Sequence, residues 1–162
     1  MPDLDEITTG EYVDLSTCGT DHELLHRVMA ILFRPIVSTD PFGNYVIAQY
    51  NGTKKTEEIM KKAPMSIVNG MLVFFLQFIE GIRKDFEGIY GDESGGSEKG
   101  SSDYFERWGW YATIAMLAGD DIIKMDLVLD KPVREFHTFL EHKLDKDKLE
   151  ANLRKGGNVK TF

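Results

Sequence analysis

Histidine spacing gives the chain its best candidate for a metal site. His22 and His26 lie four residues apart, so on a helix both imidazoles would share one face and could reach the same ion. No carboxylate or further histidine follows them at ligand spacing. His137 and His142 are five apart and do not share a face. We therefore favour solvated histidines on a helix surface and predict no bound metal.

Nucleophilic and acid–base chemistry has equally few candidates. Cys18 precedes a Gly-Thr turn and has no histidine in a recognisable nucleophile motif, so a buried or half-exposed thiol is expected. Carboxylates gather at Asp92-Glu93 and at Gly119-Asp120-Asp121, without the alternating oxygens of a calcium loop. The sequence has no phosphate-binding glycine loop, zinc knuckle or catalytic-triad signature. We predict no catalytic residue and no cofactor, hence a protein that is not an enzyme.

The aromatic block Trp108-Gly109-Trp110-Tyr111 could stack on the bases of a single-stranded nucleic acid. Arg107 is the only cation beside it, and the net charge of −8 disfavours contacts with phosphates. Packing of these rings in a protein core is the favoured interpretation, with no nucleic-acid partner.

Composition is that of an ordinary globular protein. The 162 residues are 42% hydrophobic and 28% charged, enough for one domain over residues 1–162. One cysteine excludes an intrachain disulfide and suits a reducing compartment. The acidic first ten residues contain no apolar stretch and do not resemble a signal peptide.

The segment from Pro64 to Ile82 is apolar nearly all the way round and is expected to be buried. It could be the central helix of a soluble domain, a membrane span or a surface for another protein. Its uncharged run of about 17 residues is at the lower limit for a span. Asn69 and Gln77 would be costly in hydrocarbon, and no Trp or Tyr belt marks its start. A buried soluble helix is the better interpretation, so no membrane is expected.

Periodicity, caps and breakers predict a mainly α fold, a small helical domain with one β-hairpin. The expected elements are an extended lead-in over 1–20, a helix over 22–33 capped by Asp21, a hairpin of 35–37 with 44–50, a short helix containing Ile59 and Met60, the central helix over 64–90, a flexible linker over 91–103, an aromatic helix over 104–118, an apolar element over 121–129, a last helix opened by Lys131-Pro132 and stopped by Gly156-Gly157, and a loose tail over 158–162.

Several side chains are expected to form either the core or a surface for a client protein. Phe74 and Phe75 are better explained as core than as a pocket. The full set of candidates is Met71, Phe74, Phe75, Phe78, Trp108, Trp110 and Tyr111. The side chains of the last helix expected to face inward are Val133, Phe136, Phe139, Leu140, Leu144, Leu149 and Leu153.

Several different short blocks follow one another along the chain in a characteristic order. The blocks are Ile7-Thr8-Thr9-Gly10-Glu11-Tyr12 with Leu15, Met29-Ala30-Ile31-Leu32-Phe33-Arg34-Pro35, Tyr45-Val46-Ile47 with Tyr50-Asn51-Gly52-Thr53, Met60-Lys61-Lys62-Ala63-Pro64-Met65, Gly70 with Phe74-Phe75, and Trp108-Gly109-Trp110 with Leu117-Ala118-Gly119-Asp120, Ile123-Lys124 and Val128. In this order they resemble the tail assembly chaperones encoded beside the tape-measure gene of tailed bacteriophages. Nothing matches between the blocks or in the 91–103 linker.

The resemblance implies a non-enzymatic, mostly helical viral protein. Such chaperones bind the long hydrophobic tape-measure protein in the host cytoplasm and keep it soluble while the tail tube polymerises. They leave before the tail is complete, during virion morphogenesis. The expected partner is therefore a tape-measure or other tail protein, with a homo-oligomer also possible because surplus apolar surface favours association.

Three alternatives remain open from the sequence. The first is a permanent virion component, such as a tail-completion or baseplate protein. The second is an enzyme whose site is built from residues far apart in sequence. The third is a membrane-associated protein.

Overall fold

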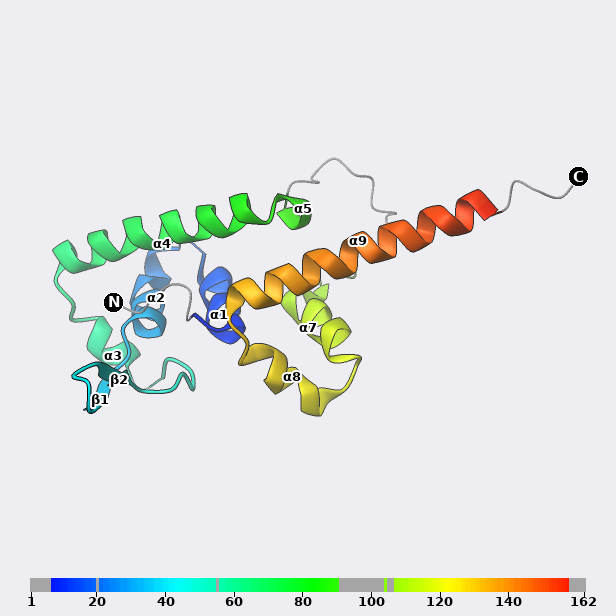
Figure 1. Cartoon of the computed structure of the whole chain (residues 1–162). Helices are drawn as coiled ribbons and strands as arrows, with labels where there is room; N and C mark the ends of the chain where they lie inside the picture. The colour runs from blue at the N-terminus through cyan, green and yellow to red at the C-terminus, as the bar shows by residue number, and fades with distance from the viewer. Residues whose placement is uncertain (1–6, 20, 55, 91–103, 105–106, 158–162) are drawn as a thin grey trace, which may run out of the picture. The chain divides into compact units, whose positions relative to one another are not determined.

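The computed structural model describes residues 7–19, 21–54, 56–90, 104 and 107–157 (Figure 1). It confirms a mainly α fold with one small two-stranded hairpin. Contacts divide the chain into two compact units, Met1–Ile79 and Glu80–Phe162. The boundary lies inside a helix, so the division does not test the prediction of a single domain. The predicted linker over 91–103 and tail over 158–162 lie outside the described residues.

The first unit begins with helix α1, Thr9–Cys18, where the sequence predicted an extended lead-in. That prediction is wrong because a capping box was overlooked. Thr8 Oγ1 accepts a hydrogen bond from the Glu11 N–H at 3.3 Å, and Glu11 Oε2 accepts one from the Thr8 N–H at 2.8 Å. Tyr12 and Leu15 then bury the inner face of the helix.

The second helical segment starts with the 3-10 turn η2, His22–Leu24, and continues as α2, Leu25–Leu32. Asp21 caps it as predicted, since its carboxylate accepts from the Glu23 N–H at 2.9 Å. Just after α2, Arg34 lies 3.2 Å from Glu11 Oε1 and donates to the Ala48 carbonyl at 3.0 Å. This guanidinium therefore links the start of α1 to the backbone at Ala48, which follows the second strand of the hairpin.

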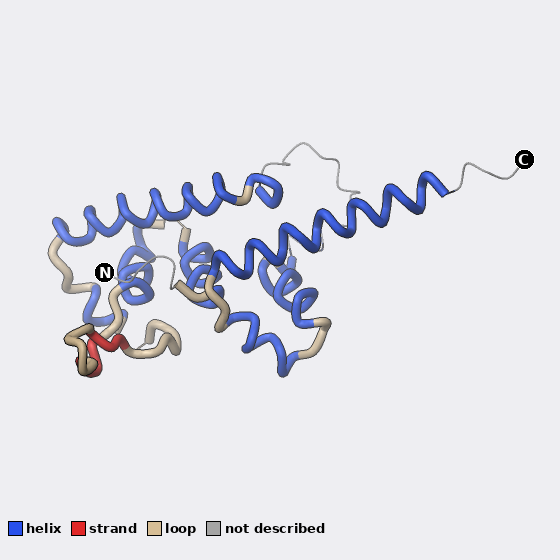
Figure 2. Tube along the Cα trace, viewed as in Figure 1, coloured by secondary structure: helices blue, strands red, loops and turns tan. Residues whose placement is uncertain are grey.

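The predicted hairpin is confirmed, with strands shorter than expected. Strands β1, Ile36–Thr39, and β2, Tyr45–Ile47, pair antiparallel (red in Figure 2). Between them Asp40 accepts from the Phe42 and Asn44 N–H groups, each at 2.8 Å. Most hairpin side chains are exposed. The short helix α3, Glu57–Met60, follows where it was predicted.

Helix α4, Met65–Asp85, starts after Pro64 as predicted, and α5, Glu87–Tyr90, completes the expected stretch. Its burial differs from the expectation. The buried residues recur at alternating spacings of three and four and form one stripe: Val68, Met71, Phe75, Phe78 and Ile82. Large apolar side chains on other faces are exposed: Met65, Ile67, Val73 and Leu76. The prediction of burial all the way round is therefore wrong.

In the second unit, helices α7, Trp110–Ala118, α8, Ile122–Leu129, and α9, Val133–Gly157, follow one another closely. The aromatic helix predicted over 104–118 is interrupted at Gly109, whose φ of 47° is accessible mainly to glycine. The predicted break at Gly119-Asp120 is confirmed, with φ of 69° and 58°.

Only the first turns of α9 bury an apolar stripe. Val133, Phe136 and Leu140 are buried as predicted and Leu144 is half-buried. The inward placement expected of Phe139, Leu149 and Leu153 is wrong, since they are 57%, 58% and 65% exposed. Every described side chain from residue 145 to residue 154 is exposed, and i,i+4 ion pairs such as Arg154–Glu150 run along this part.

Candidate functional site

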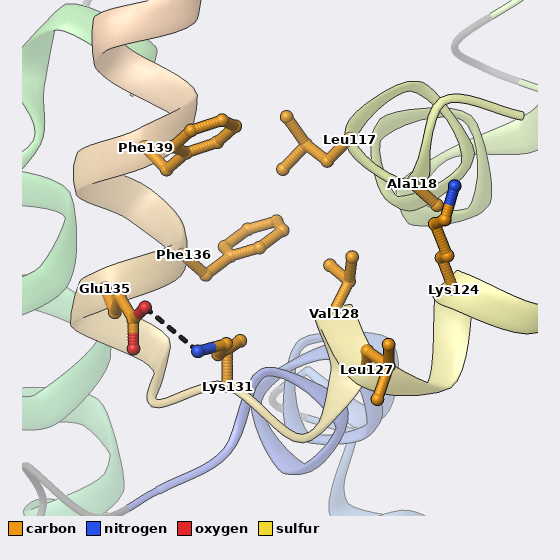
Figure 3. Close-up of a pocket in the computed structure, with 9 residues that line it drawn as sticks. All are labelled: Leu117, Ala118, Lys124, Leu127, Val128, Lys131, Glu135, Phe136 and Phe139. Atoms are coloured by element: carbon orange, nitrogen blue, oxygen red, sulfur yellow. Dashed lines mark hydrogen bonds and ion pairs between the residues drawn. The ribbon is translucent and has the colours of Figure 1, made fainter. Parts of the chain in front are cut away.

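Helices α7, α8 and α9 enclose an apolar groove of about 370 Å³ in the second unit (Figure 3). Phe136 and Phe139 extend from α9 toward Leu117 of α7 and Val128 of α8. Leu127 and Phe139 remain 64% and 57% exposed. The residues that line the groove are Leu117, Ala118, Lys124, Leu127, Val128, Lys131, Glu135, Phe136 and Phe139.

The groove exists because two sharp turns fold three short helices back on one another. Gly119 and Asp120 both adopt positive φ, which ends α7 and reverses the chain. Asp121 then caps α8, since its carboxylate accepts from the Ile123 N–H at 3.0 Å. Lys131-Pro132 separates α8 from α9, where proline fixes the backbone for a helix start.

Charged groups lie at the rim of the groove and are already paired within the chain. Lys131 Nζ is 3.2 Å from Glu135 Oε1, and Lys124 Nζ is 3.1 Å from Asp121 Oδ2. An apolar floor with a polar rim can bind apolar side chains of a partner and exclude water from them. These surface ion pairs are not an arrangement of nucleophile, base and orienting group.

A buried histidine lies beside the groove residues on α9, and the sequence analysis missed it. His137 is fully buried; its Nδ1 is 2.8 Å from the Val133 carbonyl and its Nε2 is 2.6 Å from the Tyr90 hydroxyl. A carbonyl only accepts, so Nδ1 carries the proton and Nε2 accepts from Tyr90. Burial lowers the pKa of His137, partly opposed by the Val133 carbonyl. The spacing of Val133, His137 and Leu140 on one stripe was the signal that could have revealed it.

The first unit contains a polar cluster around Glu57 in a hollow of about 600 Å³. Glu57 Oε1 lies 2.8 Å from His26 Nε2 and 3.6 Å from an Arg27 nitrogen, and Thr53 donates to its other oxygen at 3.2 Å. The hydrogen bond from His26, with smaller help from Arg27 and Thr53, lowers the pKa of Glu57. Cys18 borders the hollow as the predicted buried thiol, and burial raises its pKa. These contacts join α2 to α3.

His22 and His26, the pair considered for a metal site, do not lie on one continuous α-helix. His26 Nε2 is paired with Glu57 Oε1 at 2.8 Å. His22 lies in the 3-10 turn rather than in α2. Among the described residues no group of three or more His, Cys, Asp or Glu side chains is placed to hold a metal ion.

The candidates on α4 divide between core and surface. Met71, Phe75 and Phe78 are 2%, 2% and 6% exposed. Phe78 packs edge-on against Tyr12 at a ring separation of 6.4 Å. Phe74 is half-buried. The three buried side chains are therefore core, and a partner cannot reach them without unfolding this unit.

Unlike the α4 candidates, most aromatic candidates of the second unit are exposed rather than part of the core. Trp108 and Tyr111 are 44% and 53% exposed and contact each other with ring centroids 5.6 Å apart. Arg107 lies 5.3 Å from the Trp108 ring. The prediction that Trp108 and Tyr111 pack in the core is therefore wrong. Trp110 is half-buried and packs against Phe136 at 6.1 Å.

One helix in the described part of the chain, α4, is long and apolar enough to cross a membrane by length and composition alone. Only 28% of its most apolar window is buried within the structure. Comparisons with protein-family models, with curated proteins and with solved structures gave no match for this chain.

Proposed function

We propose that this chain is a non-enzymatic tail assembly chaperone of a tailed bacteriophage, which binds a hydrophobic helical client, the tape-measure protein, in the host cytoplasm. The observation that carries the proposal is the open apolar groove of the second unit. A groove of about 370 Å³ with a polar rim suits the apolar face of a client helix. The ordered sequence blocks that resemble such chaperones supply the identity of the client.

The groove makes a better client surface than the core residues of α4. Leu127 and Phe139 are both large, apolar and more than half exposed, so a partner can bury them without disturbing the fold. Fully burying a side chain of this size contributes roughly 1.5–3 kcal/mol, part of which Leu127 and Phe139 have still to gain. A few such contacts along a long client would hold it in solution while leaving it releasable.

The proposal is tested by co-expressing the tagged chain with the tape-measure protein and measuring the client recovered in the soluble, co-purified fraction. Leu127→Asp places a carboxylate in the groove and should reduce client recovery by about tenfold or more, the equivalent of about 1.4 kcal/mol. Ile123→Asp is the matched control, because Ile123 lies on the same helix, is 79% exposed and does not line the groove. Equal recovery with both variants would contradict the assignment of the groove.

The alternative is a permanent virion protein, such as a tail-completion or baseplate component. It predicts that purified particles contain the chain at fixed stoichiometry, whereas a chaperone is absent from them. Quantitative mass spectrometry of purified particles distinguishes the two.

A further inference from the structure

The outer face of α4 lies opposite its buried stripe and is centred on Val73. At 3.6 residues per turn, Val73 is on the far side of the helix from the buried residue Ile82. Val73 itself is 56% exposed. We call the exposed side of α4 from Met65 to Gly81 the α4 outer face.

We infer that the α4 outer face binds the same face of a second copy of this chain, with the two helices antiparallel and a two-fold axis through Val73. Such an axis brings the residue n positions before Val73 to the same height as the residue n positions after it, so the two meet across the seam when both lie close to the line through Val73. A two-fold interface requires each half of a surface to complement the other half. The pairs along α4 meet that requirement in both shape and polarity.

The apolar side chains and the glycines lie on different flanks of the face. Leu76, 43% exposed, and Met65, 68% exposed, lie on one flank, and Gly70 and Gly81 lie on the other. Because the two-fold axis brings like flanks together, the large apolar side chains of both copies line one side of the seam and the glycines of both copies line the other. A Cβ built on either glycine has no atom within 4 Å, so the space above both backbones is open. Val73 faces its own copy at the axis. On the glycine side of the seam the two helix backbones can therefore approach each other closely.

The polar pairs match hydrogen-bonding partners. Asn69 faces Gln77, so their amides can donate to and accept from each other. Ser66 faces Glu80, where a hydroxyl can donate to the carboxylate. All four side chains are exposed within one chain. A parallel pair would instead place Glu80 against Glu80, so this pattern specifies the antiparallel orientation.

A second copy fits this face better than lipid does. In a bilayer, Asn69, Gln77 and Glu80 would point outward without partners, which is costly. In the antiparallel pair each of them has a partner, and the two helix dipoles oppose each other favourably. The paired stretch from Met65 to Gly81 is about 24 Å long, more than two heptads of contact. The groove residues take no part, so this inference does not depend on the proposed client.

The first test is the oligomeric state of the full chain, measured by light scattering coupled to size-exclusion chromatography. The wild type should be a dimer, and Val73→Lys should be a folded monomer, because two ammonium groups would meet at the axis. Ile123→Lys is the matched control on α8, where the side chain is 79% exposed, and it should remain a dimer. A monomeric wild type at the highest soluble concentration, or a dimeric Val73→Lys variant, would overturn the inference.

The second test fixes the orientation by disulfide formation between introduced cysteines. Val73→Cys should form a covalent dimer under mild oxidation, and a mixture of Asn69→Cys with Gln77→Cys should form the mixed dimer. Asn69→Cys alone should not, because eight residues of rise, about 12 Å, exceed the Cα separation of about 7 Å that a disulfide tolerates. The wild type is the internal control, since its one cysteine, Cys18, is buried.

The oxidation pattern also separates the other possible occupants. Covalent homodimers of Asn69→Cys would indicate parallel helices and overturn the inference. Absence of the Val73→Cys dimer would overturn it as well, whether the wild type then partitions into membranes or remains soluble with a client.

Discussion

Two neighbouring residues of α4, Phe75 and Leu76, should respond very differently to the same truncation. Phe75 is 2% exposed in the core of the first unit, whereas Leu76 is 43% exposed on the α4 outer face. Composition alone makes them equivalent members of one apolar run. The comparison of Phe75→Ala with Leu76→Ala therefore tests which side of the helix faces the core.

The expected magnitudes follow from burial. Truncating a buried phenylalanine to alanine typically costs about 3–5 kcal/mol, which includes the cavity left behind. Leu76 has less surface removed from water and leaves no enclosed cavity, so its loss should be about 1 kcal/mol or less. Because the total free energy of unfolding of a domain is about 5–15 kcal/mol, Phe75→Ala should remove a large part of it. Phe75→Asp adds the cost of burying a carboxylate and should leave the protein unfolded or insoluble.

The measurement is urea unfolding followed by far-ultraviolet circular dichroism. Low protein concentration keeps association through the α4 outer face from adding to the stability of the wild type. The midpoint should shift strongly for Phe75→Ala and little for Leu76→Ala, with similar slopes. Equal shifts, or a soluble and fully folded Phe75→Asp variant, would show that the face carrying Phe75 is not core.

Three further changes have defined outcomes. Glu11→Ala should lower the free energy of unfolding by about 3 kcal/mol, because the Glu11 carboxylate is 3% exposed and its loss leaves Arg34 without that ion pair. Urea unfolding measures this loss, with Glu23→Ala as the exposed control. The stability of the wild type should fall as the pH drops through about 6.5, since the lowered pKa of His137 makes the unfolded chain bind the proton first, and His137→Gln should show a smaller slope in thermal unfolding against pH. Gly119→Ala should lower the free energy of unfolding by about 1–2 kcal/mol, because the φ of 69° at this position is strained for alanine. Thermal unfolding measures the loss.

Local sequence signals predicted the elements whose ends are marked by special backbone chemistry. Pro64 marks the start of α4 and Gly119 the end of α7, each by a rule that needs no tertiary contact. Where α8 forms with Asp121 as its cap, the sequence predicted only an apolar element over 121–129. The hairpin followed from β-branched residues on both sides of a turn that Asp40 closes with its own carboxylate. Local signals of this kind do not show how far the hairpin is covered, and most of its side chains are exposed.

Helix α1 shows how a correct rule can be missed when periodicity is taken as the main signal. Its ten residues carry only a weak apolar stripe, so a search for period gives no helix. The pattern Thr8-x-x-Glu11 is nevertheless a capping box, which fixes the first turn by two reciprocal hydrogen bonds. Glu11 is then held in place by Arg34, a contact that no local pattern contains.

Burial was less predictable than secondary structure, because it depends on how many neighbours a helix obtains. The apolar run of α4 is long enough to surround the helix, yet only the stripe through Met71, Phe75 and Phe78 is covered. Phe139 on α9 keeps the correct helical spacing and still opens into the groove. In both helices the extra apolar residues lie where the described part of the chain leaves them exposed, and these are the surfaces to which we assign partners.

The two assigned surfaces share no residue, so their roles can be separated. If a dimer presents two copies of the groove, a long client with repeated apolar segments can bind both, and the second contact is then intramolecular. Val73→Lys should therefore weaken client recovery in the co-purification assay although it leaves every groove residue unchanged. Leu127→Asp should again reduce recovery by about tenfold or more while light scattering still shows a dimer. Equal recovery by wild type and Val73→Lys would mean that each groove acts alone, and that self-association serves some purpose other than holding the client.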